Sequence, residues 1–322
     1  LSKDYIEEHF NIKVIDFELK EVMRQEHGSG ILKNATQIRN NIFGGLAESN
    51  DINSEDDISH VNSDKVLEIS KEVFDPKSFS TFTVVTHTRK LSQKYNFAIR
   101  NNLFPNERLK FVEGERLICA NTNYKYGIFN GELLKVSKVF NGPEDRIEKL
   151  LKISPTFTER KYSSIPVQSD GKMHIWLCFQ RLKLEYYDSL GKKENTECFV
   201  LENSIDSSEL TMDRAESRAL LIDFLMRYKK TKDKYMTDRK KNYLSSYEEE
   251  LAVKNGEILD RSKDELYNAL ITKYGYALTA HKAQGGEWEN AIIDLDTSFF
   301  DNYSEEYARW LYTSITTILH IQ

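Results

Sequence analysis

The sequence predicts an α/β protein whose parallel sheet is interrupted by a small antiparallel unit. Three observations support this fold class. Residues 81–86 form a β-prone run that leads through a polar turn into a helical segment, the strand–turn–helix order of α/β folds. Short β-prone runs with Asn-Gly turn signals then continue to about residue 203. After a long helical stretch, β-prone runs return at 276–278 and 291–293.

The first part of the chain opens the parallel-sheet unit. A short strand is expected at 14–17, and a helix over 31–42 places its isoleucines on one face. Residues 45–75 carry nine acidic residues against two lysines. This composition indicates a solvated connection that contains a short helix.

The next elements complete one repeat of the sheet and begin the antiparallel unit. The strand at 81–86 is followed by a helix over 90–101. The sequence then changes to short strands separated by turn signals, with Asn-Gly pairs at 130–131 and 141–142. Asn-Gly is typical of two-residue hairpin turns, so we expect a small antiparallel barrel over residues 111–203.

A helical pattern follows at about Thr211, and its far end becomes strongly basic. Residues 227–241 contain eight Lys or Arg and two Asp, with Tyr228 and Tyr235 between them. This composition is typical of a surface that follows phosphates and stacks on bases, although a solvated helix face is the alternative. The chain then returns to the parallel sheet. We therefore expect an insertion within a discontinuous domain, with boundaries at 1–110, 111–265 and 266–322.

The composition excludes a uniformly basic nucleic-acid-binding protein. Lys and Arg number 45 against 51 Asp and Glu, a net charge of −6, so any nucleic-acid surface must be local. The three cysteines are widely spaced, as expected for reduced thiols in a cytoplasmic protein rather than for a disulfide frame or a metal site. The sequence has no apolar run of roughly 18 residues, so no membrane span is expected.

A polar turn at 279–287 lies between the two returning β-prone runs. Its glycines, Gly285 and Gly286, allow the backbone to approach a phosphate closely. The alternative is a hairpin or strand–helix turn whose polar residues only face water. The segment reads Thr-Ala-His-Lys-Ala-Gln-Gly-Gly-Glu and resembles motif V of superfamily 1 helicases, in the RecD-like and Dda-like branch.

Further segments resemble helicase motifs in the family's order. Residues 21–25 (Glu-Val-Met-Arg-Gln) resemble the block that opens the second motor domain, 83–89 the strand of motif IV, and 309–316 the start of motif VI. Residues 114–119 and 129–132 resemble the edge of a small inserted barrel. The resemblance implies a RecA-like second motor domain of the P-loop NTPase type, interrupted by an SH3-type β-barrel and a helix.

The resemblance also implies two ligands for these motifs. Arg24 is the expected catalytic residue, which reaches across a domain cleft to the γ-phosphate of ATP; the alternative is a surface arginine paired with Glu21. The residues expected on the nucleotide side are Gln25, Gln284, Gly285 and Glu287. The residues expected along a single DNA strand are Thr86, His87, Thr88, Asn96, Thr279, His281 and Lys282.

Several of these residues have a structural alternative. The hydroxyls of Thr86 and Thr88 could cap a turn. Asn96 could pair with Arg100 one helical turn away, and His281 could be a buried histidine with a backbone partner. For each of these residues, the sequence leaves both the DNA-binding role and the structural role open.

The function implied by the resemblance is that of the C-terminal half of an ATP-dependent DNA helicase, which translocates 5′ to 3′ on single-stranded DNA in repair or recombination. No G-x-x-x-x-G-K-[ST] loop occurs in the sequence. We therefore expect ATP and Mg²⁺ to bind mainly to an N-terminal RecA-like partner domain, and this fragment alone to be inactive.

One position departs from the family's pattern. Motif VI continues into an arginine where this chain has Thr317. Either the motor is impaired, or residues are missing before Ile318. An impaired motor corresponds to the alternative function, a non-catalytic module that binds nucleic acid or protein on a helicase scaffold. An RNA-directed relative is a third possibility, because nothing in the sequence distinguishes DNA from RNA.

Overall fold

The computed structural model describes most of the chain, and the fold is given for that part. The described residues are 3–15, 29–44, 51–79, 81–105, 109–188, 190–207, 211–284, 286, 288–295 and 304–317. The strand expected at 14–17 falls partly outside them, and its described residues, Val14 and Ile15, are not in a strand.

A three-stranded parallel sheet forms the first unit. Its order is β8-β1-β9, and both pairs of neighbours are parallel. The strands are β1 (Thr83–Thr86), β8 (Ala277–Thr279) and β9 (Ala291–Ile293). The central strand is buried along its whole length, as expected for a parallel strand that is covered on both faces.

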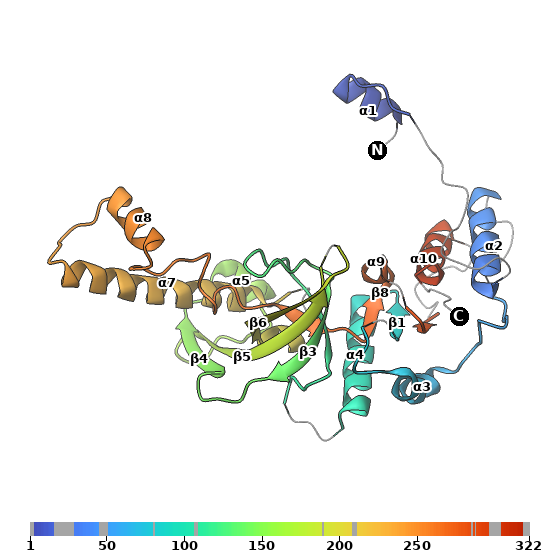
Figure 1. Ribbon diagram of the computed structural model, residues 1–322, viewed down its shortest axis with the longest axis horizontal. Coiled ribbons are helices and arrows are strands. Elements are labelled where there is room, and N and C mark those ends of the chain that lie inside the picture. Colours follow the sequence, from blue (N-terminus) through green and yellow to red (C-terminus); the bar gives the residue numbers. More distant parts are fainter. Residues whose placement is uncertain are drawn as a thin grey trace.

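Helices cover both faces of this sheet (Figure 1). Val84 of β1 packs in one core with Ile99 of α4 (Arg89–Leu103). The next residue, Val85, points to the opposite face and packs in a second core. That core contains residues of α2 (Gly30–Gly44) and α10 (Glu305–Ile315), which lie against each other. The α/β class and the helices expected near 31–42 and 90–101 are thus confirmed.

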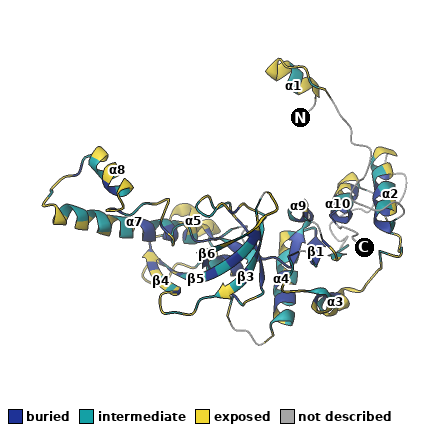
Figure 2. Ribbon diagram, in the orientation of Figure 1, coloured by how far each residue is buried: buried dark blue, intermediate teal, exposed yellow. Residues whose placement is uncertain are grey.

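Three short elements precede β1. Helix α1 (Lys3–Phe10) has no buried residue and lies apart from the two sheets (Figure 2). The acidic connection contains a 3₁₀ turn, η1 (Ser63–Lys65), and helix α3 (Val66–Val73), which packs against α4. The short helix expected in this connection is therefore present.

The second unit is a six-stranded antiparallel sheet. Its order is β4-β5-β3-β2-β7, and β6 pairs with β5. The strands are β2 (Arg116–Cys119), β3 (Leu133–Val139), β4 (Arg146–Ile153), β5 (Met173–Tyr187), β6 (Lys193–Leu201) and β7 (Thr272–Tyr274).

The antiparallel sheet curls on itself. Val200 of β6 forms a parallel bridge with Leu270, two residues before β7. The Leu270 N–H donates to the Phe199 carbonyl at 2.8 Å, and the Leu201 N–H donates to the Leu270 carbonyl at 2.9 Å. This bridge brings β6 beside the segment that leads into β7. The antiparallel unit is confirmed, whereas its assignment as an SH3-type barrel remains a prediction.

The remaining helices lie mainly around the antiparallel sheet. They are α5 (Phe157–Tyr162), α6 (Asn203–Asp206), α7 (Arg214–Asp238), α8 (Ser246–Lys254) and, after β8, α9 (Ala280–Ala283). The far end of α7 extends away from both sheets together with α8, at the left of Figure 1. None of the described helices combines the length and the apolar character that a membrane span requires.

The two sheets are joined at Gly275. Strand β7 pairs with the antiparallel sheet and β8 with the parallel one, so the chain passes between the sheets within two residues. A Cβ atom on Gly275 would lie 3.0 Å from the carbonyl carbon and oxygen of Leu117. Such a contact is tighter than nearly all real Cβ contacts, so glycine suits this close backbone approach. The domain boundaries expected at 110 and 265 remain a prediction.

Candidate nucleic-acid interface

The carboxyl ends of two neighbouring parallel strands place two of the predicted residues side by side. Thr86 ends β1, Thr279 ends β8, and the two residues are register partners. Ligands of open α/β sheets commonly bind at this edge. Thr86 is buried, and its Oγ1 donates to the carbonyls of Thr88 at 3.1 Å and Leu278 at 3.4 Å. Thr279 is half-buried and lines a groove.

Thr88 begins helix α4. Its Oγ1 accepts the Leu91 N–H at 3.2 Å, which makes Thr88 the N-cap residue. The structure therefore shows the capping role for this hydroxyl. Arg89 follows as the first helical residue and is exposed. The cap thus places the Arg89 cation at the start of α4, next to the carboxyl end of β1.

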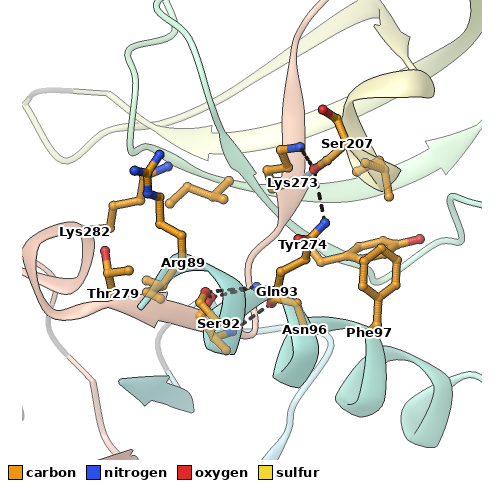
Figure 3. A pocket seen from close by; sticks show the side chains of 14 residues that line it. Arg89, Ser92, Gln93, Asn96, Phe97, Ser207, Lys273, Tyr274, Thr279 and Lys282 are labelled. Atoms are coloured by element: carbon orange, nitrogen blue, oxygen red, sulfur yellow. Dashed lines mark hydrogen bonds between the residues drawn. The ribbon is translucent and has the colours of Figure 1, made fainter. Parts of the chain in front are cut away.

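A groove of about 80 Å³ lies between α4, β8 and the end of β2 (Figure 3). Arg89, Thr279 and Lys282 line one end of it. Burial lowers the pKa of the Lys282 ammonium, and the neighbouring Arg89 cation adds to this effect. Within the described part of the chain, neither cation forms an ion pair with a carboxylate. Two uncompensated cations beside a hydroxyl can hold a phosphate group.

The other end of the groove is closed by protein contacts. The Lys273 ammonium donates to the carbonyls of Ser204 and Ser207. The Gln93 amide donates to the same Ser207 carbonyl at 3.1 Å. These contacts hold α4 against α6, so Lys273 is already committed to carbonyl oxygens. Among the described residues, the cationic end without carboxylate partners is the one formed by Arg89 and Lys282.

The two predicted histidines have different environments. The His87 ring packs edge-on against Trp310 of α10, with ring centroids 5.7 Å apart. Burial lowers the pKa of His87, and Glu306 only partly opposes this shift. His87 is thus a half-buried link between the β1–α4 turn and α10. His281 is exposed on α9, so the alternative of a buried structural histidine is wrong.

Asn96 binds the backbone of β8. Its Oδ1 accepts the N–H groups of Tyr276 and Ala277, both at 2.8 Å. Its Nδ2 donates to the Ala277 carbonyl at 2.7 Å. The alternative pair with Arg100 is not formed, because Arg100 binds Glu115 at 2.9 Å. In this position Asn96 fixes the strand that carries Thr279, and it also lines the groove. Its contact with a DNA strand remains a prediction.

The turn after α9 is held close to Trp288. The Gly286 N–H donates to the Ala283 carbonyl at 3.0 Å, and a Cβ on Gly286 would lie 2.8 Å from Trp288 Nε1. Trp288 is 2% exposed and lies 5.7 Å from the Arg116 guanidinium. Gln284 is exposed at the end of α9. The other residues expected on the nucleotide side lie outside the described residues: Arg24, Gln25, Gly285 and Glu287.

Sequence reasoning missed Arg89 and Arg116 as parts of this region. Arg89 could have been found, because a cap residue at Thr88 makes the next side chain the first to emerge at the helix start. Arg116 is almost fully buried between the two sheets, where it lies over Trp288 and Phe74 and donates to the Phe82 carbonyl. Burial lowers its pKa to about 10. No sequence pattern indicates such a buried cation.

The basic end of α7 is largely occupied by α8 and neighbouring segments. Arg227 pairs with Asp223 and Asp264, and three more of its cations have carboxylate partners: Lys232, Arg239 and Lys241. Tyr228 donates to Glu249, and Tyr235 lies under Arg239. The two tyrosines therefore pack within this hairpin and do not present free rings for base stacking. The structure favours the alternative of a solvated helix face, on which half of the eight cations form ion pairs and the other four are exposed.

Thr317 is buried at the end of α10. Its Oγ1 donates to the Ser314 carbonyl at 2.8 Å. A hydroxyl bound in this way supplies no charge to a neighbouring cleft. Among the described residues, no group of His, Cys, Asp and Glu side chains is arranged to hold a metal ion.

Comparison with known proteins supports the helicase resemblance at one place in the chain. Residues 274–316, which contain β8, α9, β9 and α10, match the model of the UvrD-like helicase C-terminal domain. This match supports a relationship to the C-terminal half of superfamily 1 helicases. The RecD-like and Dda-like branch remains a prediction. A search of curated protein sequences found no match.

Solved structures with some similarity are also helicases. The chain is 13% identical to a Pif1 helicase from Bacteroides in complex with ADP-AlF3 and ssDNA, with a TM-score of 0.36, covering 94% of this chain and 49% of that chain. The chain is also 13% identical to the Pif1 helicase from Candida albicans, with a TM-score of 0.35, covering 94% of this chain and 56% of that chain. The chain thus spans about half the length of these helicases. Similarity at this level does not establish a shared fold.

Proposed function

We propose that this chain is the C-terminal motor half of an ATP-dependent DNA helicase that moves along single-stranded DNA. The family match over residues 274–316 supports the helicase part of the proposal. The observation that carries the nucleic-acid part is the groove end formed by Arg89, Thr279 and Lys282, whose cations have no carboxylate partner among the described residues. Phosphates of one strand would bind there.

The groove lies beside the part of the turn at 279–287 that we expect to face the nucleotide. Lys282 lies on α9, and Gln284 ends this helix two residues later. A change in the turn caused by ATP would therefore move Lys282 and alter the grip on the strand. In this proposal Gln25, Gln284, Gly285 and Glu287 face the nucleotide, and Arg24 reaches its γ-phosphate.

The longer protein would supply the rest of the motor. ATP and Mg²⁺ would bind mainly to an N-terminal RecA-like domain, which closes on this RecA-like half during each cycle. Movement would be 5′ to 3′, in DNA repair or recombination. The inserted antiparallel unit would lie along the strand.

A second candidate is a binding module without motor activity. The buried Thr317 favours it, because its hydroxyl is bound to Ser314 and supplies no second cation for phosphoryl transfer. The two candidates differ in one measurement on the full-length protein. DNA-stimulated ATP hydrolysis supports the motor, whereas strand binding without hydrolysis supports the module.

The groove is tested by binding of a fluorescent single-stranded oligonucleotide to this chain, measured by anisotropy over a range of salt. Arg89→Gln and Lys282→Gln should each weaken binding. Each should also make the negative slope of log affinity against log salt less steep by about 0.7, the effect of one phosphate contact. Lys71→Gln is the matched control, because it removes the same charge from an exposed position on α3.

Unchanged binding in the two groove variants would contradict strand binding at the groove. If Arg89→Gln and Lys282→Gln keep the affinity and the salt slope of the control, the strand does not bind at this edge of the sheet. Loss of binding in all three variants alike would indicate only a general effect of charge.

A further inference from the structure

Two aromatic side chains of the loop between β2 and β3 face solvent. Tyr124 is 88% exposed and Phe129 is 50% exposed. Burying such a side chain is worth about 1.5 to 3 kcal/mol, and neither ring receives this stabilisation in full.

The loop is built to hold these rings outward. Asn123 and Ile128 form an antiparallel bridge, with N–H···O distances of 2.7 and 3.2 Å. Ile128 is fully buried in the main core. Because successive residues of an extended segment point to opposite sides, the burial of Ile128 turns the adjacent Phe129 toward solvent.

Further hydrogen bonds brace the tip of the loop. The Asn123 Oδ1 accepts the N–H groups of Lys125 and Tyr126, and its Nδ2 donates to the Asn268 carbonyl at 2.8 Å. Lys125 Nζ donates to the Lys263 carbonyl at 2.6 Å. Gly127 turns the chain with a φ of +66°. A loop tied in this way holds the backbone of Tyr124 in place, which lowers the entropy cost of binding.

The base of the loop adjoins the cationic groove. Ile118 of β2 lines the groove, and the next residue, Cys119, ends β2 just before the loop. The Lys282 cation lies close enough to Cys119 to lower the pKa of its thiol, although burial outweighs this effect and raises it to about 11. The Gly131 N–H donates to the Cys119 carbonyl at 2.9 Å and closes the loop at its base. A strand held at Lys282 therefore has the base of this loop as its neighbour.

We propose that Tyr124 and Phe129 stack on nucleobases of the single strand whose phosphates bind at Arg89 and Lys282. The proposal rests on the proposed function. Stacking needs only an exposed ring face in polar surroundings and tolerates any base sequence. The neighbouring exposed residues of the loop are Asn121, Gly127 and Asn130. A protein interface would instead require a continuous apolar centre, so a single-stranded nucleic acid is the partner that this loop fits.

The test compares two oligothymidylates of equal length, one normal and one in which abasic sites replace all bases. Tyr124→Ala and Phe129→Ala should each weaken binding of the normal oligonucleotide by about fivefold or more. The salt slope should stay unchanged, because no phosphate contact is lost. Tyr124→Phe and Phe129→Tyr should retain the affinity of the wild type. Tyr247→Ala is the control, since Tyr247 is 75% exposed on α8, away from the groove.

The abasic oligonucleotide separates stacking from a change in the loop. It should bind the wild type, Tyr124→Ala and Phe129→Ala equally, because it has no base to stack. If the alanine variants lose affinity equally for both oligonucleotides, the rings act through the fold of the loop and the stacking proposal is overturned.

The outcomes also distinguish base stacking on the loop from phosphate binding at the groove. If Arg89→Gln and Lys282→Gln weaken binding while the aromatic variants bind both oligonucleotides as the wild type does, the groove stands and the stacking role is overturned. If the aromatic variants weaken binding of the normal oligonucleotide and the cation variants do not, the proposal that one strand contacts both the groove and the loop is overturned.

Discussion

Asn96 shows how one buried side chain positions the candidate site. It binds two N–H groups and one carbonyl of the segment Tyr276–Ala277, which ends two positions before Thr279. Asn96→Ala would remove the acceptor of the Tyr276 and Ala277 N–H groups, whereas the Ala277 carbonyl would keep the Ser92 hydroxyl as a donor. The substitution should lower the free energy of unfolding by about 3 kcal/mol. Urea denaturation followed by circular dichroism measures this loss.

The control for this prediction is on the same helix. Asn101 is exposed, and Asn101→Ala should change the free energy of unfolding by less than about 0.5 kcal/mol. If Asn96→Ala instead kept the stability of the wild type and lost only strand affinity, Asn96 would contact the strand directly.

Only part of the site could be predicted at the scale of single residues. The sequence indicated hydroxyls and cations after two strands, and the structure brings Thr86 and Thr279 together as register partners. The sequence could not show that Thr88 uses its hydroxyl as a cap. It also could not show that Asn96 binds β8, because this contact joins residues 180 positions apart and depends on which strands are neighbours.

At the scale of elements, Asp213 fixes the start of α7. Its carboxylate accepts the N–H groups of Ala215 and Ser164, both at 2.8 Å, and thereby joins α7 to the end of α5. Burial raises the pKa of Asp213, but these hydrogen bonds outweigh it, so the pKa lies below its usual value. The stabilisation is therefore fully present above the unfolded pKa of 3.8 and is lost as the pH falls through the folded pKa.

Asp213→Ala should lower the free energy of unfolding at pH 7 by about 1 to 2 kcal/mol, the cost of a lost N-cap. The difference from the wild type should shrink as the pH is lowered from 4 toward 2, since the wild-type carboxyl is then protonated. Chemical denaturation at several pH values measures this difference. Asp238→Ala, at the exposed last residue of α7, should show neither effect. A difference that is independent of pH would exclude the ionised cap as its source.

Local patterns predicted the elements better than their partners. The strand at 81–86 and the helices near 31–42 and 90–101 were recognised from periodicity, and the structure contains each of them. The bridge between Val200 and Leu270 that curls the antiparallel sheet was not recognised, because it joins segments distant in sequence. The orientation of Tyr228 likewise depends on α8, which packs beside it.

At the scale of the whole molecule, the two sheets share one core. Val84 and Ile99 of the parallel unit pack in the same cluster as Leu117, Leu134 and Leu184 of the antiparallel unit. The sequence indicated an insertion, and an insertion often folds on its own. A shared core predicts the opposite, because neither sheet can lose its packing without exposing the apolar surface of the other.

We therefore expect one cooperative unfolding transition for this chain. Val84→Ala in β1 and Leu134→Ala in β3 should both shift that single transition, each by about 2 to 4 kcal/mol. Coincident curves from circular dichroism and tryptophan fluorescence, together with equal calorimetric and van't Hoff enthalpies, would show the two-state behaviour. An independent insertion would give two transitions, with Leu134→Ala moving only one of them and Val84→Ala only the other. Because Gly275 joins the sheets through a close contact with Leu117, one transition would also mean that the strand that carries Thr279 unfolds together with the antiparallel unit.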